Sequence, residues 1–253
     1  MTMPLPCCLL RLSLLVALAA CAQAERGTTR MPSMEERLRL AAIAEAHGNA
    51  DVALSIYRNA AAAAPDRLDA QLRLADALTA RGETGEAIAV LQRFLARRPA
   101  DRAALMALGR VQLRAGALAE AEGTFRRVLE AHPHDAEALN GLGVAADLAG
   151  DHGRAQAFYR RALEAAPAQV AARNNLALSL ALSGRAEETD RLVEELRPAL
   201  GADVRVRHTL GLVAAMRGRL GEARSLVSPE LDPEAFAAFA SAAAALAAAS
   251  ASP

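Results

Sequence analysis

AEALNGLGVAADLAGDHGRAQAFYRRALEAAPAQ, residues 136–169, contains the pattern that decides the fold. Its turn glycine, Gly150, belongs to a column of glycines that recur every 34 residues along the chain. The column comprises Gly48, Gly82, Gly116, Gly150, Gly184 and Gly218. A fixed period of this length indicates an array of similar units, each of which buries its apolar face by stacking on its neighbours.

Three further columns keep the same register. A leucine followed by alanine or glycine stands eight residues before each turn glycine, and a small residue, with Thr189 in the fifth unit, stands five residues after it. A larger apolar residue follows four positions later, and a proline closes each of the first four units. The leucines are Leu40, Leu74, Leu108, Leu142, Leu176 and Leu210; the larger apolar residues are Tyr57, Leu91, Phe125, Tyr159, Val193 and Val227; the prolines are Pro65, Pro99, Pro133 and Pro167.

These columns predict a pair of helices in each unit. The leucine fills the interior of the pair, and the small residues let two backbones approach closely. Glycine supplies the positive φ that ends the first helix, and proline ends the second because it has no N–H to donate. Residues able to cap helices stand where first helices begin: Asp101, Asp135, Asp203, and Ser33 with Glu36 as a capping box.

Counting 34 residues per unit predicts an all-α superhelix of six repeats. The repeats span residues 34–67, 68–101, 102–135, 136–169, 170–203 and 204–237. A last helix, residues 232–249, begins at Asp232-Pro233 and carries Phe236, Phe239 and Leu246 in one stripe. We expect this helix to cap the open face of the sixth repeat.

The columns resemble those of the tetratricopeptide repeat (TPR). TPR superhelices usually bind partners on their concave face, which the resemblance assigns to positions 2, 5, 9 and 12 of each first helix. The candidate groove residues chosen from this face, with Asn175 at position 6, are Leu72, Asp76, Met106, Arg110, Leu113, Asn140, Val144, Asn174, Asn175, Leu178, His208 and Leu212. Amide side chains can hydrogen-bond to an extended peptide, and apolar ones can receive its side chains. The resemblance therefore implies a protein partner.

A leader segment precedes the array. Arg11 is followed by the apolar run Leu12 to Ala20, which is too short to span a bilayer and has the proportions of a secretory signal. The run ends in Leu18-Ala19-Ala20-Cys21, which resembles the bacterial lipobox. The resemblance implies that residues 1–20 are a lipoprotein signal peptide and that Cys21 is lipidated. Residues 22–33 are polar and follow no periodic pattern, so we expect residues 21–33 to form the lipidated N-terminus and a flexible tether.

The residues after Cys21 bear on localisation. Ala22 stands where an inner-membrane retention signal would place aspartate, so by resemblance to the Gram-negative sorting rule we expect the periplasmic face of the outer membrane. In the alternative, Ala22-Gln23-Ala24 serves as an A-x-A site, and cleavage before Glu25 releases a soluble protein.

Composition and motifs point away from catalysis and from nucleic acid. Basic and acidic residues both number 29, so no net field draws the chain to nucleic acid. Gly141-Leu142-Gly143 imitates a dinucleotide-binding turn but falls inside a predicted helix, so we interpret it as packing. His132, His134 and His152 lack the ligand spacing of a metal site and are interpreted as turn residues. We expect no catalytic residue, no metal and no cofactor.

The C-terminal half resembles a narrower family. The stretches RNNLALSLALSGR (173–185), VRVRHTLGL (204–212) and ELDPEA (230–235) resemble the TPR lipoprotein of the tight-adherence (Tad or Flp) pilus machinery. Overall length, lipobox and repeat placement also agree, whereas His208-Thr209 departs from the Gln-Asn of that family. The resemblance implies a non-enzymatic, outer-membrane-anchored scaffold whose partner is the pilus secretin or another Tad component, and which aids secretin localisation or multimerisation.

Two other functions stay open at this point. A TPR lipoprotein of the same general kind could instead regulate the enzymes of peptidoglycan synthesis or hydrolysis. An enzymatic function would need a cluster of catalytic groups, which the motifs of the chain do not contain.

Overall fold

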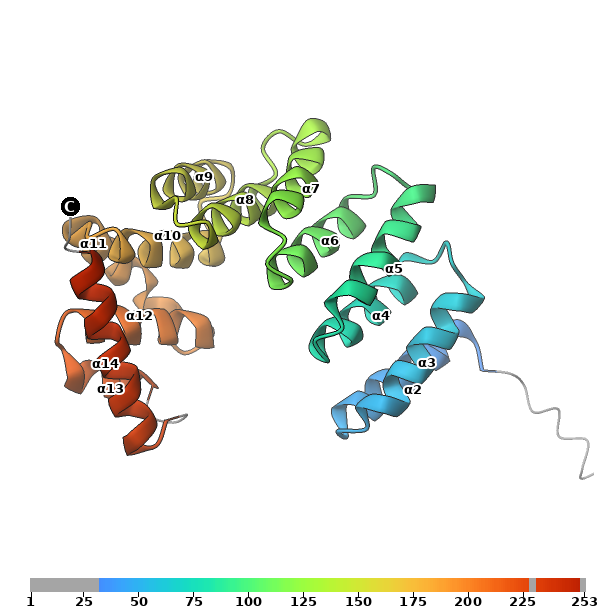
Figure 1. Cartoon of the computed structure of the whole chain (residues 1–253), viewed down its shortest axis with the longest axis horizontal. Coiled ribbons are helices and arrows are strands. Elements are labelled where there is room, and N and C mark those ends of the chain that lie inside the picture. Colours follow the sequence, from blue (N-terminus) through green and yellow to red (C-terminus); the bar gives the residue numbers. More distant parts are fainter. Residues whose placement is uncertain (1–31, 228–230, 251–253) are drawn as a thin grey trace, which may run out of the picture.

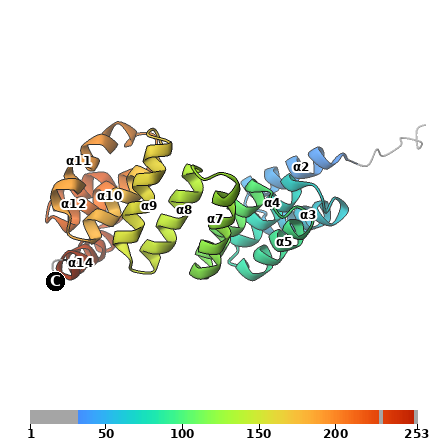
Figure 2. The same ribbon diagram turned by 90° about the horizontal axis from the view of Figure 1, so that it is seen from above.

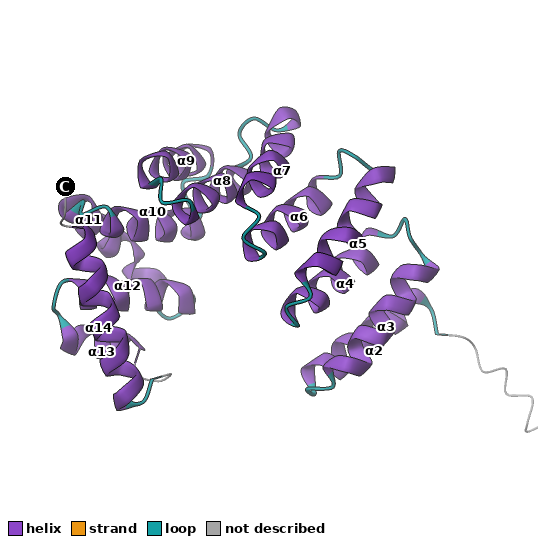
Figure 3. Ribbon diagram, viewed as in Figure 1, coloured by secondary structure: helices purple, strands orange, loops and turns teal. Residues whose placement is uncertain are grey.

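The computed structural model describes residues 32–227 and 231–250, which fold into thirteen α-helices and one short 3-10 helix. No β-strand occurs in this part of the chain (Figure 3). The helices form consecutive pairs that stack into an arch, with α2 at one end and α14 at the other (Figure 1). The predicted all-α superhelix is confirmed. The predicted signal peptide, Cys21 and residues 21–31 of the tether lie outside the described residues.

Six helix pairs follow one another in chain order. Figure 2 shows the array from above, with α2 at one end and α14 at the other. They are α2 (Met34–Ala46) with α3 (Ala50–Ala63), α4 (Leu68–Ala80) with α5 (Thr84–Arg97), α6 (Arg102–Arg114) with α7 (Leu118–Ala131), α8 (Ala136–Leu148) with α9 (His152–Ala165), α10 (Val170–Leu182) with α11 (Ala186–Leu196), and α12 (Val204–Met216) with α13 (Leu220–Val227). The 3-10 helix η1 (Arg197–Ala199) follows α11, and α14 (Pro233–Ser250) ends the described chain.

The turns and caps agree with their sequence signals. All six turn glycines have φ between 70° and 80°, which confirms the predicted left-handed backbone at these turns. Ser33 and Glu36 form the expected capping box at the start of α2. Asp101, Asp135 and Asp203 each accept a hydrogen bond from a free N–H at the start of the following helix.

The leucine column fills the interior in five of the six pairs. Leu142, for example, is 1% exposed, and its equivalents in α4, α6, α10 and α12 are also buried. Leu40 is 52% exposed, so the prediction of an interior leucine is wrong for the first pair. Every other pair has a preceding pair that covers its leucine, whereas α2 stands at the end of the described array and has no such neighbour.

The small residues beside the leucines make room for an aromatic ring. A Cβ atom added at Gly109 in α6 would lie 2.5 Å from Cε1 of Phe125, and one added at Gly141 in α8 would lie 2.6 Å from Cζ of the same ring. These glycines therefore make room for a side chain of the second helix. The prediction that small residues bring two helix backbones together is wrong here, because the Phe125 ring lies against both glycines. The motif Gly141-Leu142-Gly143 lies within α8 and serves packing.

The last helix, α14, packs against α12 and α10. Phe236 and Ala243 of α14 are buried in one cluster with Val227. The predicted stripe is wrong at Leu246, which is 40% exposed. Phe239 and Leu246 lie about 20° apart around the helix, but Phe239 packs on the cluster, whereas Leu246 lies nearer the end of α14, three residues beyond Ala243, the last buried residue described in the helix.

Candidate partner-binding groove

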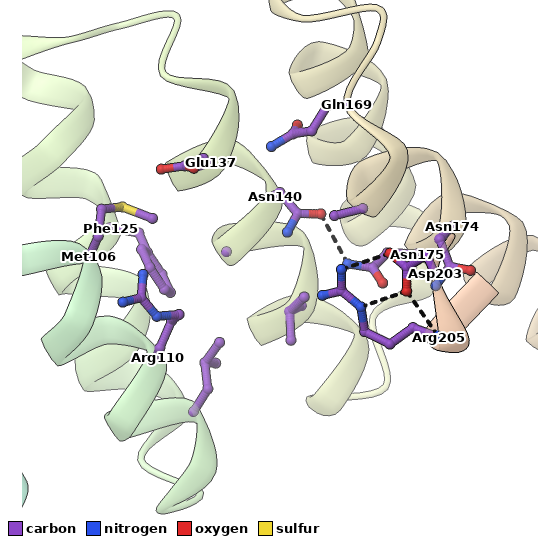
Figure 4. Close-up of a pocket in the computed structure, with 14 residues that line it drawn as sticks. Met106, Arg110, Phe125, Glu137, Asn140, Gln169, Asn174, Asn175, Asp203 and Arg205 are labelled. Carbon is purple, nitrogen blue, oxygen red and sulfur yellow. Dashed lines mark hydrogen bonds and ion pairs between the residues drawn. The ribbon is translucent and has the colours of Figure 1, made fainter. Parts of the chain in front are cut away.

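The first helices of the central pairs, α6, α8 and α10, line the inner side of the arch, and α7 and α9 lie on its outer side (Figure 1). A pocket of about 390 Å³ opens on this inner side, between α6, α8, α10 and the start of α12. It is lined by Met106, Arg110, Leu113, Phe125, Glu137, Asn140, Gly141, Val144, Gln169, Ala171, Asn174, Asn175, Asp203 and Arg205 (Figure 4). Volumes of this size are typical of sites that bind a small ligand or a few residues of a chain.

More than half of the groove residues chosen from the sequence meet in this pocket. They are Met106, Arg110, Leu113, Asn140, Val144, Asn174 and Asn175. The structure places the others elsewhere: Leu72 and Asp76 on α4, Leu178 on α10, and His208 and Leu212 on α12.

Other lining residues were not among the candidates. Glu137, Ala171 and Arg205 occupy position 2 of their helices, a column assigned to the concave face from which no residue was selected. Phe125 approaches the pocket from a second helix. The glycines at 109 and 141, which leave room for its ring, are the feature of the sequence that could have indicated this.

Two amides connect neighbouring repeats at the centre of the pocket. Asn175 Nδ2 donates a hydrogen bond of 3.0 Å to Asn140 Oδ1 (Figure 4). Asn174, only 7% exposed, precedes Asn175 in the sequence, and its Oδ1 accepts no hydrogen bond from a described residue. The same is true of Gln169 Oε1. The pocket wall is therefore rich in amide groups whose hydrogen-bonding capacity is only partly used.

The acidic residues of the pocket are engaged by arginines. Arg205 contacts Asp203 through two nitrogens, at 2.8 and 3.1 Å, and its hydrogen bonds lower the pKa of Asp203. Glu137 receives a 2.7 Å ion pair from Arg102 of α6. Arg110, in contrast, is exposed and makes no hydrogen bond or close ion pair with a residue of 32–227 or 231–250.

Asp76 lies on the preceding first helix and interacts with Arg110 at longer range. Desolvation within the curved array raises the pKa of Asp76, although the side chain itself is exposed, and the positive charge of Arg110 partly opposes that rise. No ion pair within 4.0 Å joins the two residues, so the Arg110 guanidinium stays open to an anionic group of a partner.

Asp147, at position 12 of α8, belongs to a network inside the array. It accepts hydrogen bonds from Tyr159 Oη at 2.9 Å and Ser179 Oγ at 2.7 Å, and it contacts His152 Nδ1 at 2.8 Å. Burial, followed by the Asp147 charge, raises the pKa of Tyr159. These contacts hold neighbouring repeats together, and no group of His, Cys, Asp or Glu in the described chain could hold a metal ion.

The C-terminal end of the groove is covered by the chain itself. Leu212, one of the candidate residues, packs with Met216 against the cluster that contains Phe236 and Ala243 of α14. The helix predicted to cap the array therefore also covers part of the surface predicted to bind a partner. The pocket between α6 and α10 lies outside this covered stretch.

A stack of helix pairs that holds a concave pocket of amides and apolar side chains defines a helical-repeat protein. Two family models, both described as tetratricopeptide repeat, match the chain, one at residues 44–94 and 78–144 and the other at residues 136–169. The chain is a tetratricopeptide-repeat protein. Proteins with this fold are generally non-enzymatic scaffolds. No curated protein sequence matches the chain.

Three solved structures illustrate the similarity of fold. A tetratricopeptide repeat protein from Parabacteroides merdae has a TM-score of 0.71 at 15% identity, over 89% of each chain. PilF of Pseudomonas aeruginosa has a TM-score of 0.61 at 15% identity, over 83% of this chain and 97% of its own. PilW, described as a type IV pilus biogenesis factor, has a TM-score of 0.63 at 18% identity, over 78% of this chain and 91% of its own. At these identities the likeness concerns the fold.

Among the described residues, no helix is both long enough and apolar enough to cross a membrane.

Proposed function

We propose that the protein is a non-enzymatic scaffold that holds a protein partner in its concave groove. The pocket between α6, α8 and α10 is the observation that carries this proposal. Its amides and apolar side chains suit the backbone and side chains of a polypeptide. A TPR array, moreover, offers its partner a rigid curved surface that several repeats build together.

The scaffold is proposed to serve the assembly of a Tad or Flp pilus. Two observations support this narrower role: the resemblance of residues 173–185, 204–212 and 230–235 to the Tad lipoprotein, and the fold shared with PilF and PilW. In this role the protein binds the pilus secretin, or another component of the machinery, and aids its localisation or multimerisation.

Lipidation at Cys21 is part of the proposal, with the protein held at the periplasmic face of the outer membrane. Two or three acyl chains make such an attachment stable, because each buried CH₂ contributes about 0.8 kcal/mol. The anchor confines the scaffold to the membrane in which the secretin must assemble. Confinement raises the effective concentration of the two proteins without any additional contact between them.

Deletion of the gene tests the pilus role. We expect secretin monomers to accumulate in the deletion strain in place of heat-resistant multimers, and expression of the wild-type protein to restore the multimers. Normal multimers in the deletion strain would contradict the role. Cross-linking in the envelope is the second measurement: recovery of peptidoglycan synthases or hydrolases without the secretin would favour a regulator of those enzymes.

The Cys21→Ala variant tests the anchor separately. Palmitate labelling and recovery in the outer-membrane fraction should both be lost in this variant. An Ala24→Asp variant, which spoils only the alternative cleavage site, should keep both. Mass spectrometry that finds a wild-type protein beginning at Glu25 without fatty acid would overturn the lipoprotein assignment.

A further inference from the structure

The lining of the pocket between α6, α8 and α10 indicates which kind of polypeptide it binds. This inference rests on the proposed scaffold function. Met106, Leu113 and Val144 supply apolar surface from two neighbouring first helices. The next stretch of groove, at Leu212, is packed against the α14 cluster. The pocket itself, at about 390 Å³, has room for only a few residues of a chain, and their apolar portion belongs at its α6 and α8 side.

The amide pair at the centre of the pocket matches a peptide group. Asn175 Nδ2 and Asn140 Oδ1 are used in their mutual hydrogen bond of 3.0 Å. Asn140 Nδ2 and Asn175 Oδ1 make no hydrogen bond with another described residue, and both side chains are only half-buried. One donor and one acceptor of the hydrogen-bonded pair thus stay available to a ligand. An extended backbone carries one acceptor and one donor per residue, so it can satisfy both amides.

The charge that the pocket leaves unpaired is positive. Asp203 is engaged by Arg205, and Glu137 by Arg102. Arg110 lies on α6 between Met106 and Leu113, where its guanidinium borders the apolar surface (Figure 4). A carboxylate on the ligand would form charge-assisted hydrogen bonds with this group, whereas a cation would be repelled by it.

We propose that this pocket binds a short, extended acidic peptide segment. Its backbone hydrogen-bonds to Asn140 and Asn175, an apolar side chain packs on Met106, Leu113 and Val144, and a carboxylate binds Arg110. The carboxylate is either an Asp or Glu side chain or the C-terminus of the partner. Both sources share the same chemistry, and the experiment below distinguishes them.

The test uses the full-length protein purified in detergent and a positional library of N-acetylated hexapeptides. One half of the library ends in a free carboxylate and the other half in an amide. The wild-type protein should select acidic residues in both halves if a side chain supplies the carboxylate, or bind only the free-acid half if the terminus supplies it. An apolar residue should be selected within two positions of the acidic group.

The Arg110→Glu variant provides the decisive comparison. Binding of the selected acidic peptides should fall by about tenfold or more, and peptides with Arg or Lys at the same position should gain. Arg114→Glu, the same change of charge on an exposed residue of α6 that does not line the pocket, should leave the selection unchanged. If Arg110→Glu fails to fold, Arg110→Gln should remove the acidic preference without reversing it.

Three results would overturn the inference: no selection of acidic peptides by the wild-type protein, unchanged selection in both Arg110 variants, or an equal effect of Arg114→Glu. The assay uses purified protein and is independent of the pilus experiment. Normal secretin multimers in the deletion strain with acidic selection intact would overturn only the pilus role. Loss of secretin multimers in the deletion strain, combined with no selection of acidic peptides by the purified protein, would overturn only the ligand assignment.

Discussion

The ring of Phe125 in α7 lies directly against Gly141 in α8, at a point where an added Cβ atom would come within 2.6 Å of its Cζ atom. Gly109 of α6 meets the same ring from the preceding helix, and Phe125 is completely buried between them. The ring lies among the residues around the pocket, where it supports the wall from behind. One aromatic side chain thus links the spacing of two repeats to the shape of the candidate binding surface.

Gly141→Ala should therefore destabilise the array. The ring cannot retreat from the new methyl group, because Gly109 and its helix block the other side, so we expect a loss of about 1 to 3 kcal/mol in the free energy of unfolding. Urea unfolding followed by circular dichroism measures it. Gly123→Ala in α7 is the control: no neighbouring atom lies within 4 Å of its added Cβ, so it should be neutral or stabilise by up to about 1 kcal/mol. Equal losses in both variants would contradict the packing described.

The leucine column offers a second comparison, between an interior and an end position. Leu142→Ala should cost about 2 to 5 kcal/mol, because the side chain is buried and its removal leaves a cavity. Leu40→Ala should change stability by less than about 0.5 kcal/mol, since Leu40 is largely exposed. Urea midpoints of the two variants measure the difference. A loss at Leu142 as small as that at Leu40 would mean that the period has been assigned to the wrong residues.

Much of the fold could be predicted because each column has a local physical cause. The positive φ of Gly150 and the cap at Asp135 depend on residues within one turn of the helix, so the sequence indicates them directly. The exposure of Leu40 could not be predicted in this way. A repeat period assigns the same buried position to the leucine of every unit. It does not indicate that the first unit lacks the preceding helix pair that would bury its leucine.

The pocket was only partly predictable for a related reason. Asn140 and Asn175 come from first-helix positions, which a column assignment can identify. Phe125 comes from a second helix, and Gln169 from a turn between repeats, so neither belongs to a column expected to face the groove. The covering of Leu212 depends on α14, a helix outside the repeat pattern whose path no column specifies.

Asp135 should make the stability of the array depend on pH. Burial alone would raise its pKa, but hydrogen bonds from Arg102 and from the N–H of Ala138 outweigh that effect and hold the pKa below its ordinary value of 3.8. The folded state therefore binds the proton more weakly than the unfolded state. The ionised carboxylate stabilises the fold above the ordinary pKa, and this contribution is lost as the pH falls through the lower pKa of the folded state.

The Asp135→Ala variant tests this dependence. At neutral pH it should be less stable than the wild type by about 0.5 to 2 kcal/mol, because the N-cap of α8 is lost. The difference between the two urea midpoints should then shrink as the pH is lowered from about 5 to below about 3. A difference that stays constant over this range would show that ionisation of Asp135 does not contribute.

Phe236 should hold the C-terminal helix on the array. Phe236→Ala should cost about 3 to 5 kcal/mol locally, because the ring is buried with Ala214, Ala215 and Val227. Since stability in a repeat array is a sum of unit and interface terms, we expect amide hydrogen exchange to accelerate in α12, α13 and α14 and to stay unchanged in α4 and α5. Leu246→Ala, at an exposed position of the same helix, should leave exchange as in the wild type. Unchanged exchange in Phe236→Ala would show that α14 does not stabilise the last pair, and faster exchange throughout would show that the array unfolds as one unit.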